Sequence, residues 1–424
     1  MNNKKNPFAE QPISSDGTYF SLSDMYPKAY TKHETTPFTK IRIILANGAE
    51  FEAQWFLHNF ARHCADGDIR RKIAEVRKSE QQQQKRISCL KPISETVLET
   101  TIGYEQLAVE LTAIFARREA NPYVKQALDF ALLEDFDHLY RYADLLNLEH
   151  GIEAKKLVGG LTEIMPGRPT IAEHRFPWDD VKRKTDYGSA NPLTRLDSSI
   201  IVAAEQQTMN YYMNQAGFYT SDLGRKLYAE IAMIEEQHVT QYESLMDPTT
   251  SWLECWLMHE YTECYLYYSL FMDETDPYVK SMWGRHYEIE VNHLHVAAQA
   301  LKDYERKEAA EVIPDQAFPE LISFEKNDNV SYIREVLKQS YLQGKGEDWV
   351  NVNELPSDAK FFDMQRIMIS DVEKVPSHEV IEKHIKAEGK DYRFQTAPHP
   401  IKSLDDVKRD NVSVARKKEA VASR

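Results

Sequence analysis

Residues 230–242, EIAMIEEQHVTQY, contain the pattern that decides the fold: a glutamate followed three residues later by a histidine. This pair, Glu235 and His238, lies 30 residues after another glutamate, Glu205. The same three residue types recur 55 residues later, as Glu260, Glu290 and His293. One glutamate from each of two helices, with Glu-x-x-His from each of two others, is the ligand set of a di-metal carboxylate site in a four-helix bundle.

A weaker copy of this pattern lies 155 residues earlier in the chain. It holds five matching residues: Glu50, Glu80, Glu105, Asp135 and His138. Gln83 stands where the pattern requires a histidine, and Asp135 stands where it requires a glutamate. The segment PYVK also occurs twice at this offset, at 122–125 and at 277–280. Because Asp and Glu make up only 67 of 424 residues, chance does not explain these matches, and two tandem copies of one helical domain are predicted.

The spacing of 30 residues predicts a helical hairpin. A helix rises 1.5 Å per residue, so a chain that climbs about twelve residues and returns by as many brings both carboxylates to one level. Glu235 and His238 are three residues apart and therefore share a helix face. The predicted turns fall near 65–68, 91–94, 120–122, 220–222, 247–249 and 275–277. Stacking two such hairpins brings four carboxylates and two imidazoles together.

Mixed charged and apolar residues, with Gly and Pro mostly at the proposed turns, predict an all-α protein with two tandem four-helix bundles and polar appendages. The predicted segments are an N-terminal arm (1–38), a first bundle (39–150), a Gly/Pro-rich interdomain linker (151–194), a second bundle (195–308) and a C-terminal extension (309–424). Proline-rich composition predicts that the arm is loosely ordered. Within the extension, short helices are expected at 330–343 and 377–388, and a frayed end at 403–424.

Charge and cysteine usage exclude several classes of protein. The net charge of −15 argues against binding to nucleic acid or to an anionic membrane. The start of the chain lacks an apolar signal segment, and no apolar run approaches the roughly 18 residues of a membrane span. The four cysteines form no C-x-x-C pair, which excludes a rubredoxin-type iron site and favours a reducing compartment. A soluble cytoplasmic protein is expected, and the sequence leaves open whether it forms a homo-oligomer.

The ligand types predict which metal binds. Mixed carboxylate and imidazole ligands suit iron, with manganese as the alternative, and six donors are more than zinc prefers. We therefore expect two iron ions in the second bundle, bound by Glu205, Glu235, His238, Glu260, Glu290 and His293. A weaker second site is expected in the first bundle, at Glu50, Glu80, Glu105, Asp135 and His138. The alternative for the first bundle is a retained scaffold without metal.

Three further residues share the inner face of the second bundle. Glu263 lies one turn after Glu260 and is expected either as an additional ligand or as a partner of the ligands. Tyr212 and Tyr267 each lie seven residues after a pattern glutamate. They are candidates for a redox-active or cavity-gating role, and the alternative is that they are core aromatic residues with a satisfied hydroxyl.

The set Glu205, Glu235-x-x-His238, Glu260 and Glu290-x-x-His293 resembles the ligands of the ferritin-like di-iron carboxylate superfamily, which includes rubrerythrins, bacterioferritins and bacterial multicomponent monooxygenases. The additional Glu263 resembles the rubrerythrin pattern, and residues 205–238 are similar to the arylamine N-oxygenase pattern. The resemblance implies two ferritin-like bundles. One spacing departs from it, because Glu260 follows His238 by only 22 residues. That distance leaves little room for the long crossover expected between the second and third helices.

The resemblance implies an oxidoreductase whose di-iron centre in the second bundle activates oxygen or peroxide. Because no electron-transfer motif is recognised in the sequence, an external electron donor is the expected partner. Two alternatives remain: a non-catalytic protein that binds or handles iron, and a structural helical module with degenerate sites.

Overall fold

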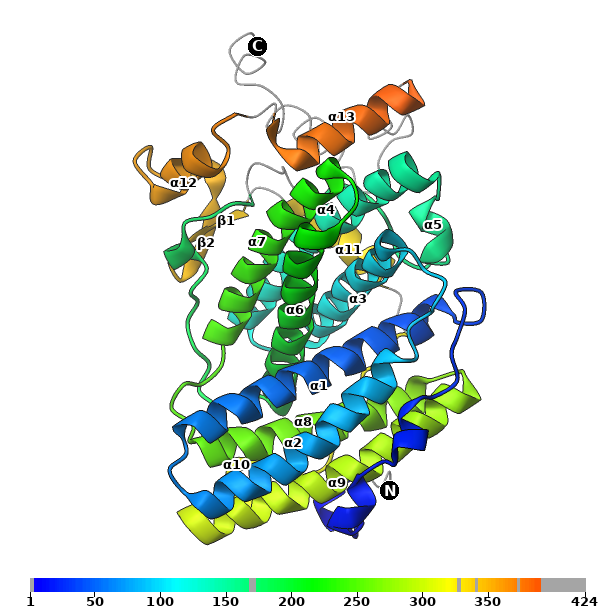
Figure 1. Cartoon of the computed structure of the whole chain (residues 1–424). Coiled ribbons are helices and arrows are strands. Elements are labelled where there is room, and N and C mark those ends of the chain that lie inside the picture. The colour runs from blue at the N-terminus through cyan, green and yellow to red at the C-terminus, as the bar shows by residue number, and fades with distance from the viewer. Residues whose placement is uncertain (1–3, 168–172, 326–328, 340–341, 372–373, 390–424) are drawn as a thin grey trace. The chain divides into compact units, whose positions relative to one another are not determined.

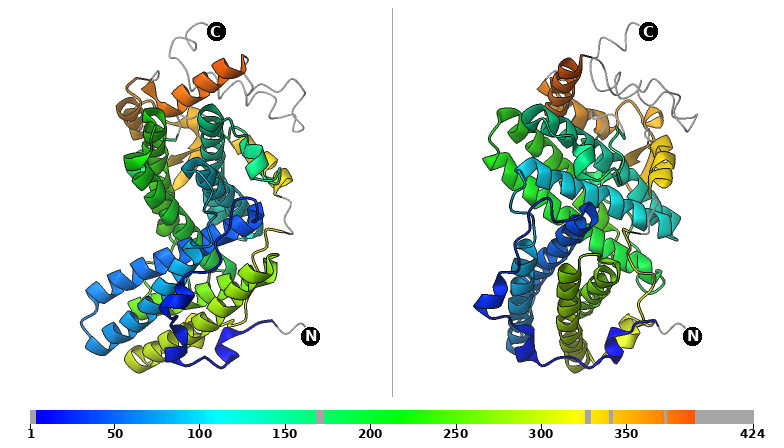
Figure 2. Two further views of the ribbon diagram at one scale, coloured as in Figure 1. Left: turned by 45° about the vertical axis from the view of Figure 1, so that its right-hand side comes forward. Right: turned by 90° about the vertical axis from the view of Figure 1, so that its right-hand side faces the viewer.

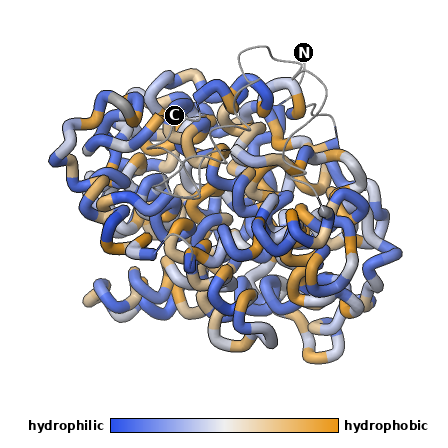
Figure 3. Tube along the Cα trace, turned by 90° about the horizontal axis from the view of Figure 1, so that it is seen from above, coloured by the Kyte–Doolittle hydropathy of each residue, from blue (hydrophilic) through white to orange (hydrophobic). Residues whose placement is uncertain are grey.

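The structure is a computed structural model that describes residues 4–167, 173–325, 329–339, 342–371 and 374–389. Most of these residues are helical, which confirms the all-α class, and their only sheet is the two-stranded hairpin β1–β2 (Figure 1). No helix in the described part of the chain is long and apolar enough to cross a membrane. Hydrophobic and hydrophilic residues are instead interleaved along the trace (Figure 3).

Eight long helices form the framework, and their starts repeat with the 155-residue offset. The first four are α1 (Pro37–His63), α2 (Gly67–Ser88), α3 (Val97–Arg118) and α4 (Pro122–His150). Their counterparts are α6 (Pro192–Phe218), α7 (Asp222–Ser244), α8 (Trp252–Asp273) and α9 (Pro277–Glu305). The predicted turns coincide with the ends of these helices.

Side-chain caps explain where the helices begin, and the caps repeat as well. Thr96 begins α3 and Ser251 begins α8, each in a capping box with the glutamate three residues on. Asn121 begins α4 and Asp276 begins α9, each followed by a proline at the first helical position. Local sequence therefore determines the helix boundaries in both halves of the chain.

The chain forms two compact units, and each unit is built from separate stretches of sequence. Unit 1 comprises residues 1–95, 185–204 and 246–327. In unit 1, α1 packs against α2 and α8 packs against α9, and the two hairpins meet through α1 with α8 and through α2 with α9 (Figure 2). The first part of α6, through Ala204, and the short α10 (Ala309–Val312) also belong to this unit.

The N-terminal residues pack on unit 1 and do not form the loosely ordered arm that was predicted. They contain three 3-10 turns that contact α2 or α9: η1 (Pro7–Ala9), η2 (Ser15–Thr18) and η3 (Leu22–Met25). Arg285 Nη2 donates to the Gly17 carbonyl at 2.6 Å, and Asn292 Nδ2 donates to the Ile13 carbonyl at 2.7 Å. Polar side chains on α9 therefore satisfy the backbone of this segment.

Unit 2 comprises residues 96–184, 205–245 and 328–424. In unit 2, α4 packs against α3 and α7, and α13 covers both α4 and α7. The shorter elements of this unit are α5 (Ala154–Leu157), η5 (Pro177–Asp179), α11 (Val330–Val336), η6 (Leu337–Gln339), β1 (Leu342–Lys345), β2 (Asp348–Asn351), η7 (Val352–Glu354), α12 (Lys360–Met368) and α13 (Pro376–Glu388).

The C-terminal extension contains structure that the sequence pattern did not predict. The predicted helix over 330–343 is wrong at Leu342 and Gln343, because these residues belong to β1, which pairs antiparallel with β2. Gly346 turns this hairpin with a φ of 55°, in the left-handed region that glycine adopts readily. The predicted frayed end, 403–424, lies outside the described residues.

The predicted consecutive bundles, 39–150 and 195–308, are not the compact units. Each unit instead combines one hairpin from each half of the chain: α1–α2 with α8–α9, and α3–α4 with α7 and the second part of α6. The predicted linker, 151–194, is wrong as a boundary as well, since its residues through Lys184 belong to unit 2. The short connections before α3 and before α8 pass from one unit to the other, so the 55-residue spacing marks a change of unit.

Candidate metal centres

Unit 2 holds six buried donor residues on four helices. They are Glu105 on α3, Asp135 and His138 on α4, Glu205 on α6, and Glu235 and His238 on α7, and each is at most 2% exposed. Their donor atoms form two groups, and within each group the atoms lie within 4.8 Å of one another. The groups are Glu105, His138 and Glu235, and Asp135, Glu205 and His238. Each group offers two carboxylates and one imidazole, so the two positions have the same composition.

A buried ion pair fixes the His238 imidazole. Its Nε2 lies 2.9 Å from Glu134 Oε2, and the other oxygen of Glu134 accepts from Arg175 Nη1. The ring therefore presents Nδ1 to its donor group, 3.5 Å from Asp135 Oδ1. A carboxylate that accepts from the second ring nitrogen is the arrangement that orients metal-binding histidines.

The second imidazole, His138, also faces a buried carboxylate, but at a longer distance and without a hydrogen bond. Its Nδ1 lies 2.9 Å from Glu235 Oε1, while Nε2 lies 4.0 Å from Glu173 Oε2. Glu173 is held in turn by Arg141, whose Nη1 donates to Oε2 at 2.8 Å. Glu173 and Arg175 both come from the segment that was predicted to be a linker. This segment supplies buried charged partners to both histidines.

Burial shifts the protonation of this donor set. Burial and the nearby Glu235 raise the pKa of Glu105 well above its ordinary value. Burial raises the pKa of Glu205 to about 7, although His238 opposes the shift. Burial lowers the pKa of His238, but hydrogen bonds with carboxylates, foremost Glu134, outweigh it and raise this pKa well above its ordinary value. Without metal, the site therefore retains protons that a divalent cation displaces.

The donor set fits a pair of divalent metal ions. Neither oxygen of Glu205 and only one oxygen of Glu105 has a hydrogen-bond partner among the described residues. Buried carboxylates without partners are costly, and two divalent cations match the charge of the four carboxylates of this site. Carboxylate and imidazole donors together suit iron or manganese.

The metal-free protein should be less stable at pH 8 than at pH 5. The pKa of Glu205 and that of Glu173 are raised to about 7, chiefly by burial. A carboxyl whose folded-state pKa is raised stabilises the fold below its unfolded pKa of 4.5, and this contribution is lost as pH rises through 7. Each group changes the free energy of unfolding by up to about 1.4 kcal/mol per pH unit. Urea unfolding of chelator-treated protein at both pH values measures the difference, and greater stability at pH 8 would contradict this expectation.

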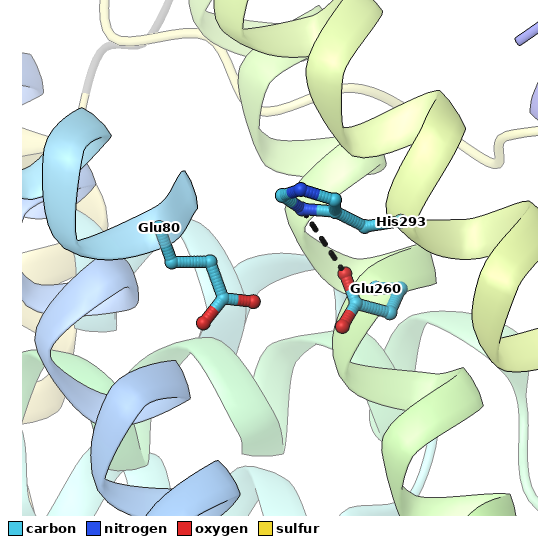
Figure 4. Close-up of side chains that lie close together, drawn as sticks. All are labelled: Glu80, Glu260 and His293. Carbon is cyan, nitrogen blue, oxygen red and sulfur yellow. Dashed lines mark ion pairs between the residues drawn. The ribbon is translucent and has the colours of Figure 1, made fainter. Parts of the chain in front are cut away.

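Unit 1 holds a related set of buried residues, each at most 3% exposed: Glu50 on α1, Glu80 and Gln83 on α2, Glu260 and Glu263 on α8, and Glu290 and His293 on α9. Donor atoms of Glu80, Glu260 and His293 lie within 4.8 Å of one another, and His293 Nδ1 is 3.8 Å from Glu260 Oε2 (Figure 4). A second group contains Glu260, Glu263 and Glu290. Unit 1 thus has one group with an imidazole and one with carboxylates alone.

The 155-residue offset maps one site onto the other. The unit 2 group Glu105, His138 and Glu235 corresponds to Glu260, His293 and Glu80 in unit 1. The unit 2 group Asp135, Glu205 and His238 corresponds to Glu290, Glu50 and Gln83. The missing histidine therefore affects one position of unit 1 and leaves the other position complete.

Both sites predicted from the sequence are divided between the units. Of the predicted strong site, unit 2 holds Glu205, Glu235 and His238, and unit 1 holds Glu260, Glu290 and His293. Of the predicted weak site, unit 1 holds Glu50 and Glu80, and unit 2 holds Glu105, Asp135 and His138. The reason is that α7 packs against α4, and α8 against α1, so the two hairpins of the same half of the chain do not share a site.

The two candidate tyrosines are buried and donate to pattern glutamates. Tyr212 Oη donates to Glu105 Oε1 at 2.5 Å, and Tyr267 Oη donates to Glu50 Oε1. Each hydroxyl therefore holds a carboxylate of the opposite hairpin in its unit, and not the glutamate seven residues before it.

Sequence reasoning missed the residues that hold the imidazoles. A signal for Glu134 was present, because three acidic residues, Glu134, Asp135 and Asp137, lie among the apolar residues of 130–139 and require buried partners. Glu173 and Arg175 follow no helical period and gave no such signal. The function of Gln83 was also missed, since its contacts depend on which hairpins meet.

Comparison of the chain with protein-family models, with curated proteins and with solved structures finds no match.

Proposed function

We propose that unit 2 binds two iron ions, with manganese as the alternative, and is an oxidoreductase that activates oxygen or peroxide. The residues that would hold the ions are Glu105, His138 and Glu235 for one, and Asp135, Glu205 and His238 for the other. Bound iron supplies redox chemistry and a Lewis acid for the oxygen species. The observation that carries this proposal is the pair of matching buried donor groups, whose two imidazoles each face a carboxylate–arginine pair.

The surrounding residues of unit 2 would orient the donors and keep bulk water out. Glu134, which is held by Arg175, limits the rotation of the His238 imidazole. Glu173, which is held by Arg141, places a buried carboxylate 4.0 Å from Nε2 of His138. Tyr212 fixes the Glu105 carboxylate and keeps a proton on Oη, next to that donor. Because the six donors are almost fully buried, the oxidant they accommodate is small, as dioxygen and peroxide are. Electrons would come from an external donor.

The connections within unit 2 support the ferritin-like resemblance better than consecutive bundles would. Unit 2 contains α4, which ends at His150, and the part of α6 that begins at Glu205, so a long connection separates its second and third helices. A ferritin-like bundle has one long crossover at this place. We infer that both units are ferritin-like four-helix bundles, and that the chain arose by a duplication whose copies exchange hairpins.

The alternative functions are an iron carrier or store and a structural module. They differ from the proposed enzyme in how tightly the metal is bound and in whether the protein catalyses a reaction. A carrier or store must release its iron, whereas donors that are at most 2% exposed favour a resident cofactor. A structural module would need no matched set of buried carboxylates without partners, which are costly to bury.

Replacing Glu235 by glutamine should remove iron from unit 2 and abolish oxygen or peroxide reduction. Glu235 contacts both imidazoles, so its loss affects both positions. Iron content, the absorption spectrum of the oxidised protein, and oxygen uptake or peroxide consumption with a reductant measure the effect. Glu236→Gln is the matched control, because Glu236 is the next residue on α7 and is exposed. Equal iron content and turnover in the two variants would refute the proposed function.

A further inference from the structure

Gln83 closes one cation position in unit 1. It corresponds to His238 of unit 2 and lies between the two carboxylates of its group. Gln83 Nε2 lies 3.0 Å from Glu50 Oε1 and 2.5 Å from Glu290 Oε1. An amide nitrogen carries two hydrogens and no lone pair for a metal, so it satisfies these oxygens in the place of a cation.

Glu50 is held in this arrangement by a second donor. The Tyr267 hydroxyl donates to the same oxygen, Glu50 Oε1, that accepts from Gln83. The counterpart of Glu50 in unit 2 is Glu205, and neither oxygen of Glu205 has a hydrogen-bond partner among the described residues. Glu50 therefore accepts hydrogen bonds from protein side chains, whereas the oxygens of Glu205 accept none from the described residues and can bind a ligand.

Glu263 gives unit 1 a carboxylate that unit 2 does not have. The corresponding residue in unit 2 is Ala108, so this carboxylate is particular to unit 1. Glu263 is 3% exposed, and neither of its oxygens has a hydrogen-bond partner in the described part of the chain. Its donor atoms form a group with those of Glu260 and Glu290 in which all lie within 4.8 Å of one another. In this group Glu290 retains Oε2, which faces His293 Nδ1 at 3.0 Å, while Gln83 holds Oε1.

A small cavity leads to Glu263. Its volume is about 20 Å³, room for about one water molecule, and its walls include the small side chains of Ala49, Ala53, Ser199 and Ala203. All of these residues belong to unit 1. The buried carboxylate thus faces a space that a small ligand or water molecule can enter.

We propose that unit 1 binds two different cations: a hard divalent ion, manganese in class, at the all-oxygen group Glu260, Glu263 and Glu290, and a second ion at Glu80, Glu260 and His293. Carboxylate oxygens suit manganese and magnesium, whereas imidazole suits iron and zinc. The four carboxylates of these two groups match the charge of two divalent ions. This inference concerns unit 1 alone and does not depend on the oxidoreductase proposed for unit 2.

Manganese binding to the whole metal-free chain tests the proposal. Glu263→Gln keeps the shape of the side chain and removes a buried charge, so the fold is retained. This variant should bind one manganese ion fewer per chain in equilibrium dialysis followed by electron paramagnetic resonance. Glu288→Gln is the matched control, because the Glu288 side chain is 58% exposed on the same helix as Glu290. Adding Gln83→His to Glu263→Gln should restore the lost ion by reopening the position at Glu50 and Glu290.

Zinc tests the class of cation. Glu263→Gln should weaken manganese binding by on the order of tenfold or more and weaken zinc binding less, since zinc prefers nitrogen-containing sites with four ligands. Manganese binding by Glu263→Gln equal to that of Glu288→Gln would overturn the proposal. Equal losses for the two metals would overturn the assignment of a hard-cation position. Either result concerns unit 1 and is distinct from loss of iron or turnover in Glu235→Gln.

Discussion

Replacing Arg175 by methionine is expected to lower the free energy of unfolding by about 3–5 kcal/mol, the cost of removing one partner of a buried ion pair. Arg175 is buried, and it pairs through Nη1 with Glu134 and through Nε with Asp180 at 2.6 Å. Both carboxylates are buried too, so the substitution removes the cation that both of them share. Because Glu134 also holds His238, the same substitution should lower the metal affinity of unit 2 as well as the free energy of unfolding.

A surface arginine of the same unit provides the control. The Arg183 side chain is 56% exposed and pairs with Glu347 and Asp348 on the surface. Arg183→Met should change the free energy of unfolding by less than about 1 kcal/mol, since water screens exposed pairs. Urea unfolding of both variants measures the contrast. A cost for Arg175→Met as small as that of the control would contradict the assigned role.

Replacing His238 by alanine is expected to weaken metal binding at unit 2 by about 100-fold or more. Loss of a residue that only orients a ligand costs about 10–100-fold, and His238 is itself a proposed ligand. The substitution also leaves the buried Glu134 without the imidazole that lies 2.9 Å from it. Titration of metal-free protein with iron(II) or manganese(II) gives the affinity. His58→Ala, at an exposed position on α1, should bind metal as the parent chain does, and similar losses in both variants would exclude a specific role.

Much of the helical architecture could be predicted because its signals are local. Thr96, Ser251 and the Asn121-Pro122 step mark helix starts by hydrogen bonding within a few residues. The 30-residue spacing depends only on the rise of a helix, and the hairpins α1–α2, α3–α4 and α8–α9 were predicted correctly. Apart from Glu263, which was found one turn after Glu260, the donor residues of both sites were found from this spacing, because it places side chains at one level and on one face of a helix.

The choice of which hairpins meet was not predictable from the same pattern. Ligand spacing is identical for any pair of hairpins at one level, and nothing in Glu235 or His238 specifies a partner. The informative signal was chain length: Glu260 follows His238 by 22 residues, whereas Glu205 follows His138 by 67. Only the longer connection leaves room for a crossover, and it joins the hairpins that share unit 2. Arg175 could not be predicted, because residues 151–184 follow no helical period.

In the metal site proposed for unit 2, the ligands come from α3–α4 and α6–α7. The most direct test is metal content at a fixed free metal concentration for two double variants and their single parents. Because Glu235 contacts both imidazoles, removal of either His138 or His238 should release both ions of unit 2, so that His138→Ala with His238→Ala loses little more metal than either single variant. The structure predicts that His238→Ala with His293→Ala affects both units, so that the two losses add. Additive losses in the first pair and non-additive losses in the second would contradict the pairing of the hairpins and with it this account of the protein.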